Sequence, residues 1–296
     1  MLYEQIASNK RKSFLLVFLF FIIIFALGYA IGLYWANPYA GMIIAGMFAI
    51  FYVPLAYFSG DSMILSMSGA RLATKKDNAY LVNTVEGLAI AAGIPTPKIY
   101  VINDTAINAF ATGRKPENAA ITVTTGALEK LKRIELEGVI AHEMSHIKNY
   151  DIRLMMLAVV LAGLVTLLGD FFLRSMWYGR GSRDDNKGGG AAIFLLIGIA
   201  LAILAPIISE LLKLAISRKR EFLADADGAL LTRYPKGLAD ALKRIKEDKD
   251  PYVDTANRAT ACLYISNPLR GSKKFLDGLF STHPPLEQRI KNLEAM

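Results

Sequence analysis

Residues Val139–Asp151 read VIAHEMSHIKNYD and contain two of the three histidines in this 296-residue chain. His142 and His146 stand four positions apart, and Glu143 directly follows the first of them. The surrounding segment, from Ala127 to about Tyr150, has a helical pattern, and side chains four apart on a helix share one face. Two imidazoles can therefore bind one metal ion while the adjacent carboxylate takes a proton from water.

This HExxH pattern is incomplete, because a catalytic zinc ion takes three protein ligands and keeps a position for water. A second predicted helix contains the sequence EFLAD, which again places two carboxylates four positions apart. We expect Glu221 to be the third ligand and Asp225 to accept the free ring N–H of a liganding histidine. Glu143 is the expected general base, since the metal lowers the pKa of water toward about 7.

The third histidine, His283, precedes two prolines and a last predicted helix. It can simply cap that turn. As a donor it can stabilise the oxyanion that forms when water adds to a peptide carbonyl. As a fourth metal ligand it would instead close the site and hold it inactive. Arg289, six residues later, can support either role or pair with a nearby acid.

A short extended segment lies between two predicted strands, Lys98–Val101 and Ala120–Val123, whose residues are largely β-branched. Peptidases can hold a substrate as a strand added to a sheet edge, which reads its backbone rather than its side chains. An ordinary covered strand is the equal alternative. The candidate edge residues are Asn108, Ala109, Phe110 and Ala111.

The composition indicates a membrane protein, since 53% of residues are hydrophobic and the mean hydropathy is +0.34. Four stretches of about 20 residues contain at most one charge each, which is the length that crosses a bilayer. The first is too uniformly apolar for a cleaved signal peptide and is expected to remain as an anchor. The four stretches are Phe14–Tyr34, Ala40–Phe58, Leu154–Leu173 and Ala191–Ser209.

The net charge of +8 gathers beside these stretches, which favours membrane topology over a nucleic-acid partner. Basic clusters precede the first stretch and follow the second and fourth, whereas the short loop Trp35–Tyr39 has no charge. The N-terminus and both large polar segments are therefore expected in the cytoplasm. The basic residues of loop 174–190 disagree, and a shallow hairpin is the alternative for the third and fourth stretches.

The predicted fold is a mainly α integral membrane protein with four transmembrane helices and a cytoplasmic α+β domain with a small β-sheet. The expected parts are a first hairpin at 1–60, a polar segment at 61–153, a second hairpin at 154–210 and a polar segment, helical throughout, at 211–296. An out-and-back second hairpin would bring Glu221 close to His146. With Cys262 as the one cysteine, no intramolecular disulfide can form.

The HExxH motif, the ExxxD helix, the late HPP segment with Arg289, and the segment NAFA together resemble the HtpX family. These are membrane-bound zinc metalloproteases of the gluzincin group, related to the CAAX prenyl proteases. The resemblance covers essentially the whole chain and implies a zincin-like domain with one zinc ion, held by His142, His146 and Glu221. It also implies an endopeptidase of the cytoplasmic (inner) membrane that acts on misfolded membrane proteins in stress-linked quality control. Asp151 matches the family spacing.

Two other functions fit parts of the sequence. A prenyl-protein protease shares the motifs, but those relatives have more spans around a large chamber. A non-enzymatic transporter or scaffold would explain Asp170 and Glu210, since acids in or beside spans often mark ion paths. Because no GxxxxGK[ST] phosphate loop occurs, hydrolysis is expected to need no nucleotide.

Overall fold

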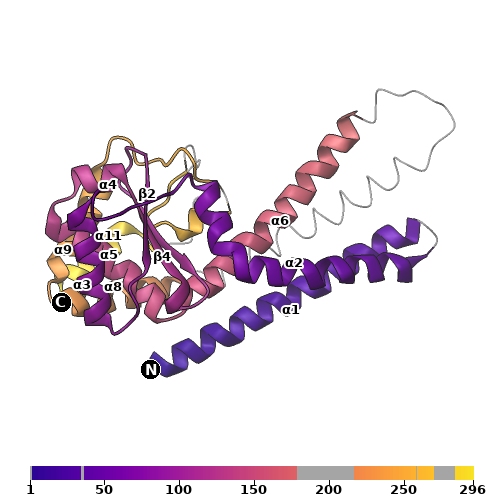
Figure 1. The fold of residues 1–296 in the computed structure, drawn as a ribbon, viewed down its shortest axis with the longest axis horizontal. Helices are drawn as coiled ribbons and strands as arrows, with labels where there is room; N and C mark the ends of the chain where they lie inside the picture. Colours follow the sequence, from indigo (N-terminus) through magenta and orange to yellow (C-terminus); the bar gives the residue numbers. More distant parts are fainter. Residues whose placement is uncertain (1, 35–36, 179–216, 258, 270–283) are drawn as a thin grey trace.

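The structure, a computed structural model, describes residues 2–34, 37–178, 217–257, 259–269 and 284–296. A small sheet and a group of short helices form one end of the molecule, and three long helices extend from it (Figure 1). The fourth predicted span, Ala191–Ser209, and the third histidine, His283, lie outside the described residues.

The long helices are α1 (Leu2–Tyr34), α2 (Pro38–Met67) and α6 (Asp151–Tyr178). α1 and α2 form a hairpin, and the first turns of α6 pack against both helices in one apolar core. The Tyr52 hydroxyl on α2 donates a 3.2 Å hydrogen bond to the Val160 carbonyl of α6. The predicted third span thus begins as a continuous helix that is anchored to the first hairpin.

The first two predicted spans are confirmed as helices long and apolar enough to cross a membrane, over Ile6–Tyr29 and Pro38–Met67. Only 33% and 22% of their most apolar windows are buried within the described part of the chain. Phe14 on α1 is 75% exposed and Phe51 on α2 is 78% exposed. Contiguous apolar surface of this kind marks a contact with something other than water, and a bilayer covers it.

The sheet has four strands in the order β1-β2-β4-β3. β2 and β4 are parallel, whereas β1 pairs antiparallel with β2 and β3 pairs antiparallel with β4. Three strands lie where the sequence predicts them; the two-residue β1, inside the basic linker, is too short to show a periodicity. The strands are β1 (Arg71–Leu72), β2 (Lys98–Ile102), β3 (Ala109–Gly113) and β4 (Ala119–Thr124).

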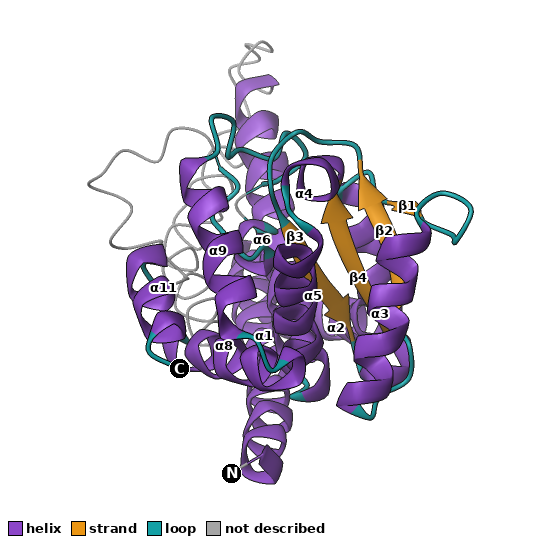
Figure 2. Cartoon of the chain, turned by 90° about the vertical axis from the view of Figure 1, so that its left-hand side faces the viewer, coloured by secondary structure: helices purple, strands orange, loops and turns teal. Residues whose placement is uncertain are grey.

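Successive side chains in a strand point to opposite faces of the sheet, and here each face packs into its own hydrophobic core. Ile121 of β4 joins a core with α3 (Ala79–Ala92) and α5 (Arg133–Lys148), which lie beside the sheet in Figure 2. Phe110 of β3 joins the other core, together with Leu154 of α6. The sheet therefore connects the metal-motif helix on one face to the membrane helices on the other.

The predicted helix from Ala127 to Tyr150 is in fact two helices, α4 (Thr125–Lys130) and α5. Lys132 has an extended backbone with ψ 159° at the start of α5. Its backbone N–H donates a 2.7 Å hydrogen bond to the Glu135 carboxylate, which satisfies one of the free donors at the helix start. This bond begins a new helix and turns the HExxH motif toward the sheet.

The expectation of helix throughout the last polar segment is wrong for residues 248–257 and 259–269, which are irregular apart from one short 3-10 turn. Two side chains accept hydrogen bonds from backbone N–H groups here. Asp248 accepts from Ile107 at 3.0 Å, and Asn257 accepts from Thr260 at 3.0 Å. Such side-chain acceptors compete with helical bonds. The helices present are α8 (Arg218–Thr232), α9 (Pro235–Glu247), the turn Ala261–Leu263 and α11 (Leu286–Glu294).

The predicted limits of the parts fall close to helix ends but not on them. α2 continues to Met67, past the expected limit at residue 60, and α6 begins at Asp151, before the expected limit at 154. The limit at 210 lies outside the described residues.

Candidate metal centre

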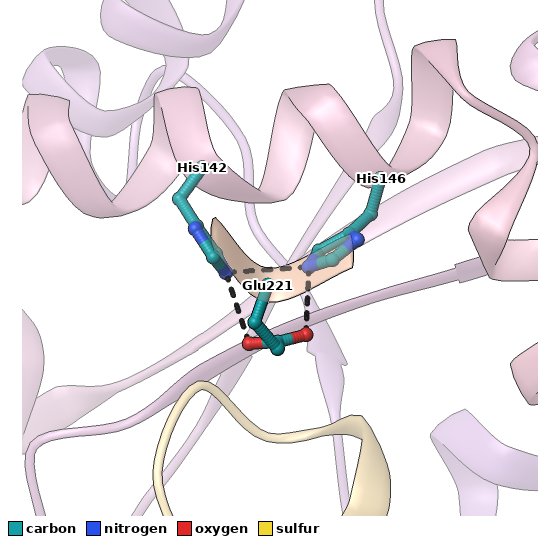
Figure 3. A group of neighbouring side chains, drawn as sticks. All are labelled: His142, His146 and Glu221. Atoms are coloured by element: carbon teal, nitrogen blue, oxygen red, sulfur yellow. Dashed lines mark hydrogen bonds and ion pairs between the residues drawn. The ribbon is translucent and has the colours of Figure 1, made fainter. Parts of the chain in front are cut away.

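His142 and His146 point from α5 toward Glu221 of α8, as Figure 3 shows. The two Nε2 atoms are 3.2 Å apart. Glu221 places Oε1 at 3.5 Å from His146 Nε2 and Oε2 at 3.8 Å from His142 Nε2. All three side chains are buried, so the converging atoms are shielded from bulk water.

These distances fit a single metal ion. Zinc binds imidazole and carboxylate ligands at about 2.0–2.2 Å, so in a tetrahedral site two ligand atoms lie about 3.3–3.6 Å apart. The separations of 3.2, 3.5 and 3.8 Å lie around that range, the last two from different oxygens of Glu221, and with one ligand atom from each residue the three atoms lie within 4.8 Å of one another. Three buried groups of this type without a cation would bring imidazoles and a carboxylate together at a high desolvation cost. The donor set therefore suits zinc.

α8 reaches this position because Gly228 lets it lie close to α5. A Cβ atom at Gly228 would stand 3.0 Å from the backbone N of His142 and 3.2 Å from its Cα. Gly228 is seven residues after Glu221, which is about two helical turns along the same face. The missing side chain thus sets the separation at which Glu221 meets the histidines.

Asp225 lies beside the His142 ring. Its Oδ1 lies 2.9 Å from His142 Nδ1, on the side of the ring opposite the nitrogen that faces Glu221. A carboxylate there keeps the proton on Nδ1, which leaves the Nε2 lone pair free for a metal. Asp225 thus contacts the ring nitrogen that faces away from Glu221, and it is not one of the three converging residues.

Arg289 of α11 holds Asp225 in place through two hydrogen bonds. Its Nε donates to Oδ2 at 2.9 Å and its Nη2 donates to Oδ1 at 2.7 Å, while its Nη1 donates to the Ile265 carbonyl at 3.0 Å. The guanidinium is fully buried and also lies 3.7 Å from Glu221 Oε2. Arg289 therefore pairs with a nearby acid, one of the arrangements that the sequence left open, while its proposed support of His283 stays a prediction.

Asp151 does for His146 what Asp225 does for His142. Its Oδ2 lies 3.1 Å from His146 Nδ1. Asp151 returns to the histidine because the chain turns sharply between α5 and α6, where Tyr150 adopts a left-handed φ of 59°. In the sequence, only the spacing of Asp151 after the motif distinguishes it from other acidic residues. The turn at Tyr150, which brings Asp151 back to His146, is visible only in the structure.

Glu143 is buried beside the two histidines. Burial, with a smaller contribution from the Glu221 charge, raises the pKa of Glu143 to about 7, against opposing contributions from His146, from Arg289 and from a backbone hydrogen bond with Ala111. A carboxylate with a pKa near the working pH can both take up and release a proton. This is the property that a general base needs when it later returns the proton to a leaving group.

The pKa values of the two histidines shift in opposite directions because their neighbours differ. Burial lowers the pKa of His142, and the hydrogen bond to Asp225 only partly opposes it. Burial also acts to lower the pKa of His146, but the hydrogen bond to Asp151 and the charges of Glu221, Asp151 and Glu143 outweigh it and raise the pKa to about 9. The negative charge of Glu221, Asp151 and Glu143 therefore favours a positive charge at His146.

β3 is an edge strand in the pairing order, but each of its residues is buried. Of the predicted edge residues, Asn108 directs its carbonyl to Thr124 of β4, and the Ala109 carbonyl accepts a 2.9 Å hydrogen bond from the Ile265 N–H. Phe110 packs edge-on against Tyr264 with ring centroids 5.0 Å apart. Ala111 lies next to Glu143. Ile265 therefore covers the strand edge at Ala109, whereas the edge at Ala111 lies beside the HExxH motif.

A buried HExxH helix whose two histidines meet a glutamate from a second helix defines a metalloprotease, here carried by membrane helices. The chain belongs to peptidase family M48, whose profile matches residues 75–296. It is similar over its whole length to proteins named Protease HtpX homolog. The one from Dictyoglomus thermophilum is 49% identical over 294 residues, covering 99% of this chain and 94% of the relative. The one from Listeria monocytogenes serotype 4a is 45% identical over 306 residues, covering 100% of both.

The fold is also similar to a solved structure, the crystal structure of S. mikatae Ste24p. The TM-score is 0.53 at 19% sequence identity, and the match covers 99% of this chain and 67% of that chain. At this identity the likeness concerns the fold alone. The HtpX resemblance seen in the sequence is confirmed by the relatives, and the protein is a membrane-bound metalloprotease rather than a transporter or scaffold.

Proposed function

We propose that this protein is a zinc-dependent, ATP-independent endopeptidase that hydrolyses peptide bonds in misfolded or damaged membrane proteins. His142, His146 and Glu221 would hold the ion. The observation that carries the proposal is the convergence of their ligand atoms, separated by 3.2–3.8 Å at a buried point between two helices. We further propose that the enzyme lies in the cytoplasmic membrane with four spans and its site on the cytoplasmic side.

Glu143 would act as the general base. A bound zinc ion supplies Lewis acidity, which lowers the pKa of water and polarises a substrate carbonyl. Glu143 takes the proton from the attacking water, holds it on its carboxylate and passes it to the leaving amine. Asp225 and Asp151 keep the imidazoles oriented, and the Arg289 guanidinium keeps Asp225 in place. His283 retains both of its proposed functional roles, oxyanion donor or closing ligand.

A substrate would pair its backbone with the outer side of β3. Ala109 and Ala111 alternate with residues bonded to β4, so their backbone groups face outward. The Ala109 carbonyl already accepts from Ile265, and the Ala111 N–H bonds the proposed base Glu143, so the pairing that we propose uses the Ala111 carbonyl. A strand that reads only backbone suits an enzyme that must accept many damaged sequences. β3 is covered in this structure, so its edge must be uncovered before a substrate binds.

Two variants of the full-length, detergent-purified protein separate the proposed roles. Glu143→Gln should retain zinc and lose casein cleavage by about 100-fold or more, because only the base is removed. Glu221→Ala should lose both zinc and cleavage, because a ligand is removed. Elemental analysis and a casein assay, with and without ATP, provide the readouts.

Glu137→Gln is the matched control, since Glu137 lies on the same helix and outside the group of converging ligands. It should leave zinc content and cleavage unchanged. Full cleavage by Glu143→Gln would refute the base assignment, and undiminished zinc in Glu221→Ala would refute the third ligand. A rate that depends on ATP would contradict the proposed independence from nucleotide.

A further inference from the structure

Asn9 is a buried polar residue in the first membrane-crossing helix, and it lies against the metal-motif region. It is 3% exposed, although its helix neighbours Lys10 and Arg11 are exposed. An asparagine amide that is buried at the foot of an apolar helix is costly unless both of its N–H groups are bonded. The contacts of Asn9 therefore indicate why it lies there.

The Asn9 amide donates two hydrogen bonds across the junction between α1 and the end of α5. One goes to Asp151 Oδ1 at 2.7 Å and the other goes to the Asn149 carbonyl at 2.9 Å. Asp151 uses its second oxygen, Oδ2, for His146 Nδ1 at 3.1 Å. A continuous chain of hydrogen bonds thus runs from the membrane helix to a candidate ligand, over more than 130 residues of sequence.

The second neighbour of Asp151 Oδ1 is Arg220, whose Nε lies 3.5 Å away. This distance is longer than the one to the Asn9 amide. A neutral amide leaves the Asp151 charge in place and fixes the direction in which the carboxylate points. The Asp151 carboxylate keeps the His146 proton on Nδ1. The direction of this carboxylate also sets the orientation of the imidazole ring and so the direction of the Nε2 lone pair.

We propose that Asn9 is a positioning residue of the metal centre, through which the first membrane helix orients His146 by way of Asp151. The proposal rests on the proposed metal role of His146. By contrast, the carboxylate beside His142 comes from Asp225 of α8, and Arg289 of α11, also in the peptidase part, holds it. One of the two imidazoles is therefore oriented from within the peptidase part and the other from the membrane part.

The test is the zinc affinity of the full-length protein in detergent, stripped with a chelator and titrated against a chromogenic zinc indicator. Asn9→Ala should lower the affinity by about 10-fold, the lower end of the range for partners that orient a ligand. Ser8→Ala, on the same helix turn, should leave the affinity unchanged. Wild-type affinity in Asn9→Ala would overturn the proposal.

A double-variant cycle separates this role from simple docking of α1. In an Asp151→Asn background, which keeps the side-chain volume, Asn9→Ala should cause no further loss of zinc affinity, because its effect passes through the carboxylate. An equal loss in both backgrounds would show that Asn9 acts only through Asn149 or helix packing and would overturn the proposal.

Cobalt provides a second readout that loose packing alone would not change. The visible spectrum of the cobalt-loaded Asn9→Ala protein should differ from the wild-type spectrum, because His146 meets the ion at another angle; an identical spectrum would count against the proposal. If Glu221→Ala loses zinc while Asn9→Ala keeps wild-type affinity, this inference fails and the proposed function stands. If Glu221→Ala keeps zinc, the proposed site itself fails.

Discussion

Each imidazole at the centre has a carboxylate behind it, and the two carboxylates come from different parts of the chain. Asp225 is neutralised by the buried Arg289, whereas Asp151 lies between a neutral amide and the more distant Arg220. This difference explains why burial prevails at His142 and lowers its pKa, while the carboxylates prevail at His146 and raise its pKa to about 9. The consequence at the residue scale is a dependence of metal binding on pH.

Zinc affinity should rise with pH through the neutral range. A protonated His146 must lose its proton to bind a metal, and its pKa of about 9 means that this proton is present at neutral pH. Apparent affinity should therefore increase by about tenfold per pH unit between pH 6 and 8, for one proton displaced.

Zinc competition titrations at three pH values measure this slope. Asp151→Asn provides the comparison, since removal of the raising charge lowers the pKa of His146 and shifts the sloping range to lower pH. An affinity that stays flat from pH 6 to 8 in the wild type would contradict the assignment of a bound proton to His146.

At the scale of elements, the site is the meeting of α5 and α8, and Gly228 sets their separation. Helix periodicity predicts that His142 and His146 share a face and that Glu221 and Asp225 share another. It does not predict the distance between the two faces. That distance reflects a close contact of α8 with the backbone of His142, where a Cβ atom at position 228 would stand only 3.0 Å from the His142 nitrogen.

Gly228→Ala should weaken zinc binding by roughly 10-fold, because the added methyl group moves Glu221 away from the histidines. It should also destabilise the folded protein by about 1–3 kcal/mol, the usual cost of overpacking against a backbone that cannot yield. Thermal unfolding of the zinc-free protein and a zinc titration give the two values.

Gly87→Ala is the control, because a Cβ at Gly87 of α3 would meet nothing within 4 Å. Alanine there should be neutral or stabilising by about 0.5–1 kcal/mol, since glycine is a poor helix former. Equal behaviour of the two variants would show that the close approach of α8 to α5 has no influence on the site.

At the scale of the whole molecule, the membrane helices and the peptidase part share one structure. α6 continues from the turn after the motif helix, and the sheet buries one face against α5 and the other against the core of α1, α2 and α6. The metal centre therefore lies close to the membrane helices, which fits an enzyme that acts on membrane proteins. This arrangement also makes the proposed topology testable with single cysteines.

Tyr39→Cys should react with an impermeant thiol reagent in intact cells, whereas Lys76→Cys should react only after the membrane is opened. Tyr39 is 75% exposed at the turn between the two spans, and Lys76 is exposed after the second span. The native Cys262 is buried, and burial raises the pKa of its thiol to about 12, so the wild type should give little background. Labelling of Lys76→Cys in intact cells would place the peptidase part outside.

The local pattern of residues by itself determined the HExxH pair, the second carboxylate pair, the first two spans and three of the four strands. Each depends on a short-range periodicity or on apolar length, which the order of residues contains directly. The last polar segment was mispredicted as helix over residues 248–257 and 259–269, because side-chain acceptors there bond backbone N–H groups, among them that of the distant Ile107.

Only the tertiary structure decided how those pieces meet. The approach of Glu221 to the histidines was expected from the second hairpin, but the bond from Asn9 to Asp151 and the contact of Ile265 with β3 join residues 142 and 156 positions apart. Their sequence patterns contain no common period, and each contact forms because packed helices and strands bring distant backbones together. The residue types fix what chemistry is available, and the packing fixes which of those residues share one site.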